Sequence, residues 1–482
     1  MSGYSSKRGE AGWYLVLRGA ASFSCTESGD AGYGGSRKWG MTLNKYLLKA
    51  TIVGALGGLL FGFDTAVIAG TTDQLSQVFH LTPVTLGLTV SIGLAGTILG
   101  AMTSGVLGQK IGGREALRVM AFLYLISAVG CAFAWNWDAL MVARFVGGLG
   151  IGGSSVLGPV YIAELAPAKW RGRMVGLFQI NIVVGILLAY LSNYIIVTQH
   201  LGARQWRWEF AVAIVPSVLF LVMLYGIPRS SRWLVTTNQT DEALEVLRLM
   251  GSPNSEAELQ EIVDSVHLER GVKEEPLFTK RYALPLFLAV SIGMFNQLSG
   301  INALLYYSNS IFASAGFSSN SAALQTVGVG LVNLLATFLG MSLIDKLGRK
   351  TLMLIGSVGM VVALSGVAWV FFTDSHKGLL MACFMLFIVF FAISQGSVIW
   401  VYIAEVFPSR VRSKGQSVGS SSHWIMNALI AGVFPYIAAK SHALPFVFFA
   451  VMMAVQFFVV LFMYPETKGR TLEQIQAGFG IK

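Results

Sequence analysis

The chain has 482 residues, of which 54% are hydrophobic and only 12% charged, with a net charge of +10. An ordinary globular protein carries about 25% charged residues, so this composition argues against a soluble enzyme or binding module. Long apolar runs cover most of the sequence, and a run of roughly 20 residues spans a bilayer as a helix. The composition therefore predicts a polytopic membrane protein.

The first segment, residues 1–45, is rich in Gly and Ser and has no long apolar run. We expect it to be disordered, or to be a misassigned start upstream of the folded protein. An N-terminal six-helix bundle is predicted for residues 46–228. Its six apolar runs cover residues 47–70, 84–107, 117–135, 139–166, 174–198 and 208–227.

Residues 229–280 are charged and have helical apolar spacing, which predicts a cytoplasmic linker of two or three amphipathic helices. A C-terminal six-helix bundle, residues 281–466, and a cytoplasmic tail, residues 467–482, complete the chain. The second set of apolar runs covers residues 281–313, 322–344, 351–373, 378–406, 415–439 and 443–464.

The two predicted bundles are related by sequence. The string VYIAE occurs at residues 160–164 and again at 401–405, and each copy is followed by Pro and then Arg at the same offsets. At a similar offset before each copy, QKIGGR at 109–114 corresponds to DKLGRK at 345–350. Ordered matches of this kind indicate a duplication. The predicted fold is an all-α membrane protein of twelve helices in two pseudo-symmetric halves.

The basic residues predict the orientation. They gather in the loops on one side, whereas the loops on the other side hold only Arg204, Arg207, Lys377 and Lys440. By the positive-inside rule, both termini lie in the cytoplasm of a multi-pass cell-membrane protein. This rule also accounts for the net charge, so no nucleic-acid partner is expected. The three cysteines have neither disulfide nor metal-site spacing, so we expect no metal and no cofactor.

Two charged residues stand inside predicted membrane helices, where charges are costly and are functional candidates by default. Asp64 lies in the first helix and Arg144 in the fourth. At 1.5 Å per residue, each lies roughly 8–9 Å from the outer end of its helix, so the two can pair. The pair is either a static brace between helices or a protonatable carboxylate tuned by its arginine.

A set of neutral polar side chains occupies the same helices, mostly in the second half. It consists of Gln179, Asn296, Gln297, Asn302, Asn333, Gln395, His423 and Asn427, with Phe61, Trp400 and Trp424 as nearby aromatic residues. Amides donate and accept hydrogen bonds, as sugar hydroxyls require, and aromatic faces suit the C–H faces of a pyranose. Any single amide serves helix packing equally well. We expect no second carboxylate or lysine within the membrane, which favours an uncharged ligand.

From about residue 46 to 475 the chain resembles the sugar porter family of the major facilitator superfamily. The resemblance rests on GGLLFGFD, on RxxGGLGIG at 144–152, on PVYIAELAPxxxRG at 159–172 and on NQLSGINALLYY at 296–307. It continues in DKLGRK, in the segment from Trp400 to Pro408 and in PETKGR. These motifs imply a carrier rather than an enzyme.

The resemblance implies roles for individual residues. Gln179, Gln297, Asn302, Asn333 and Trp400 match sugar-contacting positions, and Phe61 and Trp424 are expected to join them; Asn296, His423 and Asn427 complete the predicted substrate site. Glu164, Arg171, Asp345, Arg349, Glu405 and Arg412 match a cytoplasmic charge clamp that joins the halves in the outward-open state. Asp64, paired with Arg144, matches the aspartate of proton-coupled members.

Several positions depart from the family pattern. Asn296 replaces the first Gln of a Gln–Gln pair, and His423 stands where relatives have an amide. Gln109, Gly113 and Arg229 replace charged positions of the first half's inner loops, so we expect a weaker clamp there. His423 either substitutes for the amide or titrates and joins the proton pathway; we favour the first reading.

The sequence thus predicts a monomeric importer of a neutral monosaccharide, a hexose or a pentose such as glucose or xylose. A co-transported proton is the expected energy source, and alternating access is the expected mechanism. The alternatives are a facilitative uniporter, in which Asp64 and Arg144 form only a brace, and a membrane sugar sensor.

Overall fold

The structure is a computed structural model that describes residues 44–166, 170–252, 254–271, 275–374, 377–408, 411–470, 474–475 and 479. The expected N-terminal tail therefore lies almost wholly outside the described residues. The first half consists of α2 (Lys45–Val78), α3 (Pro83–Ile111), α4 (Gly113–Ala132), α5 (Trp137–Leu165), α6 (Arg171–Val197), α7 (Gln205–Ala211) and α8 (Ile214–Met223). Apolar side chains on all faces of these helices suit them both to the core and to lipid.

The second half repeats this plan with more interruptions. It consists of α12 (Ala283–Leu298), α13 (Ile301–Tyr306), α14 (Ser308–Ser314), α15 (Ser319–Leu347), α16 (Arg349–Thr373), α17 (Lys377–Ile393), α18 (Gln395–Glu405), α19 (Arg412–Lys440) and α20 (Leu444–Met463). Twelve helices of the described chain are long and apolar enough to span a membrane. The twelve predicted spans are confirmed, with ends that differ by up to eight residues, most in the first, sixth and seventh spans.

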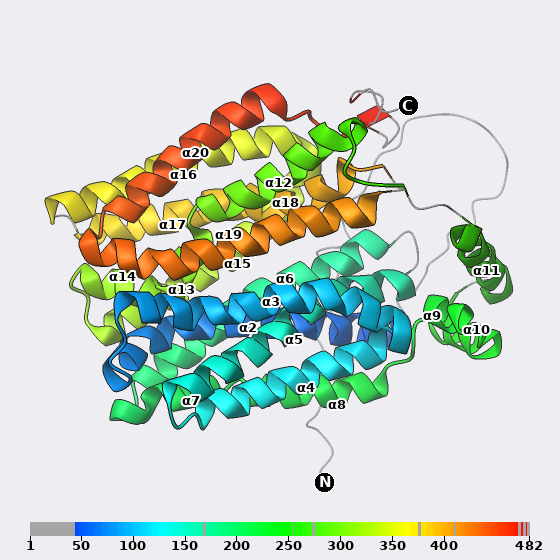
Figure 1. The fold of residues 1–482 in the computed structure, drawn as a ribbon, viewed down its shortest axis with the longest axis horizontal. Helices are drawn as coiled ribbons and strands as arrows, with labels where there is room; N and C mark the ends of the chain where they lie inside the picture. Colours follow the sequence, from blue (N-terminus) through cyan, green and yellow to red (C-terminus); the bar gives the residue numbers. More distant parts are fainter. Residues whose placement is uncertain are drawn as a thin grey trace, which may run out of the picture. The chain divides into compact units, whose positions relative to one another are not determined.

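Packing between the halves follows the duplication. α3, the second span of its half, packs against α19, the fifth span of the other half. α6, the fifth span, packs in the same way against α15, the second span of the second half. This exchange of second and fifth spans is what a two-fold relation between the halves requires. Figure 1 shows the two bundles side by side, with α3 next to the orange α19.

The seventh span is broken where the predicted substrate motif lies. α12 ends at Leu298, and Gly300 has φ +85°, a left-handed conformation that glycine adopts without steric cost. A side chain on Gly300 would also overlap the ring of Phe449. The chain then restarts as α13, so Asn296 and Gln297 lie before the break and Asn302 lies after it. Discontinuous helices of this kind expose backbone and amides to a central site.

The segment between the halves forms α9 (Ser231–Thr236), α10 (Thr240–Leu249) and α11 (Ser255–Gly271). These helices gather at one end of the bundles, which we call the linker end (Figure 1). Trp233 of α9 fixes them there, because its Nε1 donates to the carbonyl of Gln109 in the last turn of α3, at 3.0 Å. Arg229 lies over the ring of Trp233 at 5.5 Å and 3.8 Å from Glu115.

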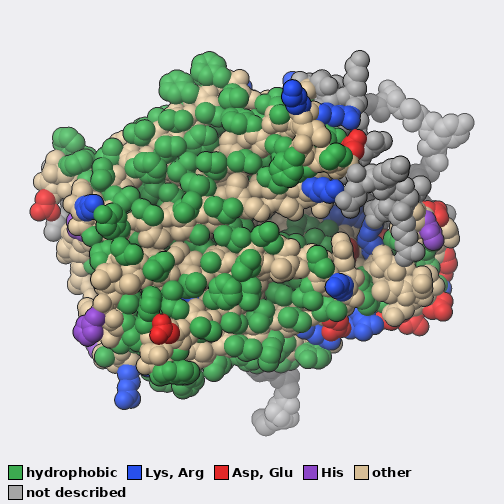
Figure 2. Space-filling model, in the orientation of Figure 1, with side chains coloured by type: hydrophobic (Ala, Val, Ile, Leu, Met, Phe, Trp, Pro, Cys, Tyr) green, Lys and Arg blue, Asp and Glu red, His purple; other side chains and the backbone are tan. Residues whose placement is uncertain are grey.

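The outer surface of the bundles carries an apolar belt. Figure 2 shows hydrophobic side chains over the middle of the visible face, with basic and acidic side chains concentrated at the linker end. Large exposed side chains such as Val142, Val215, Trp369 and Phe462 contribute to it, with 60–78% of their surface accessible. Soluble proteins rarely expose apolar patches of this extent. The chain is a multi-pass membrane protein.

Candidate transport site

Asp64 of α2 and Arg144 of α5 form an ion pair between two spans of the first half. Nη1 of Arg144 lies 3.3 Å from Oδ2 and 3.4 Å from Oδ1 of Asp64. Only 5% of the arginine side chain is accessible, against 18% for the aspartate. Nε of Arg144 is buried without a hydrogen-bond partner in the described chain. The arginine is therefore held in place with one N–H group that lacks an acceptor, while the carboxylate keeps partial access to solvent.

One small cavity joins this pair to aromatic residues of the other half. Its wall contains Phe61, Asp64, Thr65, Val90, Gly93, Leu94, Thr97, Arg144 and Ile151 from the first half, and Tyr306 and Trp424 from the second. Its volume is about 10 Å³, which is room for one water molecule. The charged pair and the predicted sugar-contacting aromatic residues thus share one space across the interface between the halves.

Gln297 is the centre of the amide cluster. Its Nε2 donates to Oδ1 of Asn296 at 3.1 Å and lies 3.2 Å from Nε2 of His423, and its Oε1 accepts from Nδ2 of Asn302 at 3.1 Å. Gln297 is 1% exposed. The structure therefore brings together four of the predicted substrate residues, from both sides of the break in the seventh span and from α19.

Aromatic rings continue this cluster toward the first half. The ring of His423 lies 5.1 Å from that of Trp400 and 5.0 Å from that of Trp424. Trp424 in turn lies 5.5 Å from Phe61 of α2. Contacts therefore run without interruption from Gln297, through His423 and Trp424, to Phe61 in the cavity beside Asp64. Trp400 keeps 38% of its surface accessible and is therefore only partly covered by the protein.

Three predicted amides have spare hydrogen-bonding capacity. Gln179 of α6 and Asn333 of α15 form no side-chain hydrogen bond with any described residue, although Asn333 is only 6% exposed. Asn427 donates to the hydroxyl of Tyr306 at 3.1 Å, but its Oδ1 is buried without a donor. By contrast, Gln395 donates to Gln456 at 2.7 Å within the second half, away from this cluster.

The second half has a dense charged network at the linker end. Arg349 donates from Nη2 and Nε to the two oxygens of Glu405, at 2.9 and 3.2 Å, and from Nη1 to Asp345 at 3.1 Å. Glu466 accepts the backbone N–H groups of Arg349 and Lys350 at 2.9 and 3.0 Å. Burial raises the pKa of Glu466, but these and further backbone N–H donors outweigh it and hold that pKa below its usual range.

The first half has a different network, because Gly113 stands where the second half has Arg349. Glu164, the counterpart of Glu405, lies instead beside Ser230 and Arg232 at the start of α9. Glu115 pairs with Arg114 and Arg118, both at 2.6 Å.

The remaining predicted clamp arginines differ from each other. Arg171 is exposed and forms no ion pair with a described residue, and Arg412 donates to the carbonyl of Phe407 at 3.4 Å. No ion pair between described residues joins the two halves at the linker end.

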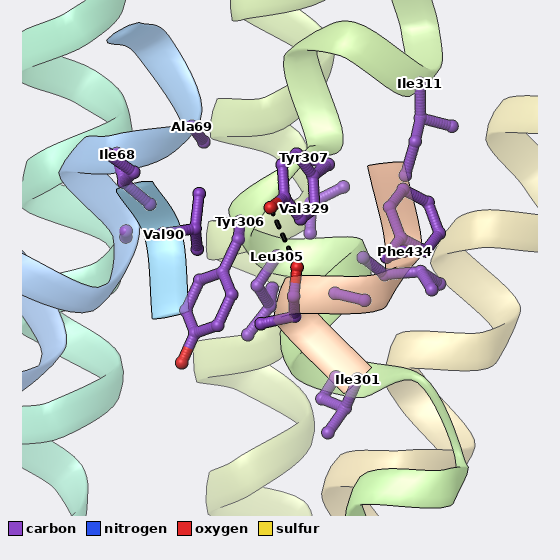
Figure 3. Close-up of a cluster of buried hydrophobic side chains, with 14 of the residues drawn as sticks. Ile68, Ala69, Val90, Ile301, Leu305, Tyr306, Tyr307, Ile311, Val329 and Phe434 are labelled. Carbon is purple, nitrogen blue, oxygen red and sulfur yellow. Dashed lines mark hydrogen bonds between the residues drawn. The ribbon is translucent and has the colours of Figure 1, made fainter. Parts of the chain in front are cut away.

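At the opposite end, marked by α14, polar contacts do join the halves. The hydroxyl of Ser310 donates to Asp73 at 2.6 Å and lies 3.0 Å from the hydroxyl of Thr72, and Tyr190 donates to the carbonyl of Leu305 at 2.9 Å. Figure 3 shows the apolar cluster here, with Tyr306 projecting from α13 toward Val90 of α3. The site is therefore closed at the α14 end.

The expectation that the membrane interior holds no second carboxylate is wrong. Glu209 of α7 is 0% exposed and lies within the sixth span, Gly202–Gly226. Glu209 is the second residue of the predicted run 208–227, so the sequence places it at the edge of the membrane. Its burial depends on the packing of α7 against α2 and α6, which the sequence does not reveal. Glu209 contacts none of the amides described above.

Two six-helix bundles, a broken seventh span and a buried polar site between the halves define a membrane carrier. The sugar (and other) transporter family model matches residues 50–479, and the chain belongs to this family. The D-xylose–proton symporter of Escherichia coli is 34% identical over 90% of this chain and 96% of its own length.

Two further similarities cover the whole fold. A glucose transporter of Staphylococcus epidermidis is 35% identical over 90% of this chain and 97% of its own length. The xylose transporter from E. coli, solved in an inward open conformation, superposes with a TM-score of 0.80 at 33% identity, covering 90% of this chain and 99% of that one. The resemblance to sugar porters is thereby confirmed.

Proposed function

We propose that this transporter imports a neutral monosaccharide, a hexose or a pentose, together with a proton. The single observation that carries the proposal is the shared cavity. Asp64 and Arg144 line the same small space as Phe61, Tyr306 and Trp424. A proton on the carboxylate and a sugar against the aromatic residues would therefore both affect how the two halves close around this cavity.

The amide cluster suits a polyhydroxylated, uncharged ligand. Gln297, Asn296 and Asn302 satisfy one another in the structure, and a sugar would replace these contacts with hydrogen bonds to its hydroxyls. Gln179 and Asn333 add amides that have no hydrogen-bond partner among the described residues, from α6 and α15 on the two sides of the interface. Trp400, which the protein only partly covers, has a ring that fits the C–H face of a pyranose.

The coupling follows from electrostatics. Protonation of Asp64 removes its attraction for Arg144 and leaves a neutral acid, which is cheaper to enclose than a carboxylate. With the proton and the sugar bound, the α14 end closes through Ser310, Asp73 and Thr72. Release toward the linker end, which we assign to the cytoplasm, returns the proton, and the ion pair of Asp64 with Arg144 forms again.

The charged networks at the linker end would form the opposite gate. In the structure, Arg349, Glu405 and Asp345 pair within the second half, and no ion pair between described residues joins the halves at the linker end. We infer an inward-facing state, in agreement with the relative that superposes in its inward open conformation. In the outward-facing state, Glu164, Arg171, Glu405 and Arg412 would meet across the interface, with the first half contributing the weaker part.

Purified protein in liposomes tests the proposal. Labelled glucose and xylose should accumulate inside when the outside is made acidic, and a proton ionophore should abolish the accumulation. Unlabelled monosaccharides should compete, whereas amino acids and organic acids should not. Equilibration without accumulation would indicate a uniporter, and binding without any movement of sugar would indicate a sensor.

A further inference from the structure

A second carboxyl group lies buried in the first half, at the α14 end and apart from Asp64. Glu209 is 0% exposed and forms no ion pair among the described residues. Its Oε1 accepts from Nε2 of Gln205 at 2.9 Å, but its Oε2 is buried without a donor. An ionised carboxylate in this setting would carry a large desolvation cost.

Asn193 of α6 presents a matching unsatisfied atom. Its Nδ2 donates to the carbonyl of Val67 at 3.0 Å, which fixes the orientation of the amide. Its Oδ1 is therefore an acceptor, and it too is buried without a donor. Both side chains press on Gly70 of α2, where an added methyl carbon would lie 3.0 Å from Oε2 of Glu209 and 2.5 Å from Nδ2 of Asn193. Two side chains that each carry an unsatisfied acceptor therefore lie beside the same glycine.

The charges around Glu209 do not supply a counter-ion. From α2, Asp73 adds a like charge one turn beyond Gly70. On α7 itself, Arg207 donates to the carbonyl of Ala132 on α4 and lies over the ring of Trp206 at 4.5 Å. From α5, Arg144 is paired with Asp64.

The other two neighbouring helices bring no charge. Residues 186–197 of α6 include no acidic or basic residue, and their titratable groups are the hydroxyls of Tyr190 and Tyr194. On α4, the Cys131 thiol faces Ser127 at 4.0 Å.

We propose that Glu209 is a second proton-binding residue. Its proton stays on Oε2, and this O–H group donates a hydrogen bond to Oδ1 of Asn193. This hydrogen bond links α7 to α6 where both pack against α2. No covalent bond is made or broken. This inference does not depend on the coupling role proposed for Asp64. The site lies within one half, so closing and opening of the transporter need not expose it.

Infrared spectroscopy of the purified protein tests this proposal directly. The D64N variant removes the other candidate carboxylic acid of the membrane interior. At neutral pH its spectrum should contain a carboxylic-acid C=O band that is absent from D64N/E209Q. The matched control D64N/E242Q changes an exposed glutamate, 47% accessible, and should leave the band unchanged. In D64N/N193A the band should shift, because the acid loses its acceptor.

Thermal stability gives an independent readout. A folded state that keeps a proton which the unfolded chain releases loses stability as pH rises. The melting temperature of D64N should therefore fall from acid to neutral pH relative to that of D64N/E209Q. Identical C=O bands in D64N and D64N/E209Q would overturn the proposal and place a cation or water between the two oxygens. If E209Q does not fold, an unshifted band in D64N/N193A would overturn it equally.

Because neither readout measures transport, they remain informative if Asp64 proves not to couple protons. If the Glu209 band is absent, the coupling role proposed for Asp64 still stands. If Asp64 does not couple protons, the proposal for Glu209 still stands.

Discussion

At the residue scale, the proposed substrate site is a set of amides that satisfy one another in the structure. Gln297 illustrates this, because it contacts Asn296, Asn302 and His423 at 3.1–3.2 Å and is almost fully buried. Such a residue exchanges protein partners for ligand partners, so its net contribution to binding is one or two ordinary hydrogen bonds.

Gln297→Ala should therefore weaken sugar binding without removing the protein from the membrane. Loss of one neutral hydrogen bond costs about 0.5–1.5 kcal/mol, which is a few-fold to about tenfold in the half-saturation constant. Initial rates of uptake measure it. Gln395→Ala is the matched control, because this buried glutamine bonds Gln456 inside the second half and should affect stability but not affinity. Equal affinity of Gln297→Ala and wild type would assign Gln297 to helix packing.

His423 should act as a hydrogen-bonding residue rather than as a proton carrier. Its described contacts are Gln297, Trp400 and Trp424, and none of them is charged. His423→Gln keeps a polar side chain of comparable reach and should retain uphill transport with a changed preference among sugars. Accumulation under an imposed pH gradient measures this. A variant that moves sugar only downhill would place His423 in the proton pathway.

At the element scale, the seventh span depends on one glycine. Gly300 combines a positive φ with close contact to Phe449, so α12 can end and α13 begin within three residues. This break holds Gln297 and Asn302 at hydrogen-bonding distance, although an unbroken helix would place residues five apart on different faces.

Gly300→Ala should destabilise this span strongly. A left-handed conformation costs a non-glycine residue about 1–2 kcal/mol, and displacement of Phe449 adds to this. Gly202→Ala is the matched control, because Gly202 also has positive φ (+58°) but an added methyl group there would meet nothing within 4 Å. Melting temperatures in detergent should fall more for Gly300→Ala than for Gly202→Ala. Equal decreases would mean that the contact with Phe449 carries no weight.

The sequence predicts elements better than it predicts contacts. The length of each apolar run predicts each of the twelve spans, because it is a local property of the helix. The internal repeat predicts that these spans form two related halves. The pairing of Asp64 with Arg144 could be anticipated because their depths in the bilayer follow from residue counts. The bond of Asn427 to Tyr306, the partner of Glu164 and the burial of Glu209 could not, because each depends on how helices from distant parts of the chain rotate against each other.

At the scale of the whole molecule, two halves close on each other at the α14 end. α3 and α19 approach each other so closely that a methyl group on Gly87 would overlap the carbonyl oxygen of Gly432. This approach is possible only while the halves are together at that end. The interface is therefore sensitive to a single added side chain.

Gly87→Leu should hold the α14 end open and trap an outward-facing state. The variant should bind sugar but not transport it, and a cysteine introduced at Val90 should react faster with a water-soluble thiol reagent than in wild type. Gly105→Leu is the matched control on the same helix, because an added methyl group there meets nothing within 4 Å. Full transport by Gly87→Leu would contradict closure through α3 and α19.

In the proposed mechanism, the proton carried by Asp64 drives sugar accumulation. Arg144 lies 3.3 Å from this carboxylate, in a cavity shared with Trp424, so neutralising the carboxylate should release the pair permanently.

The most direct measurement compares wild type with Asp64→Asn in proteoliposomes under an imposed pH gradient. We expect wild type to accumulate sugar, whereas Asp64→Asn should exchange sugar for sugar but no longer accumulate it. Undiminished gradient-driven accumulation by Asp64→Asn, or wild-type uptake that is indifferent to the gradient, would contradict this mechanism.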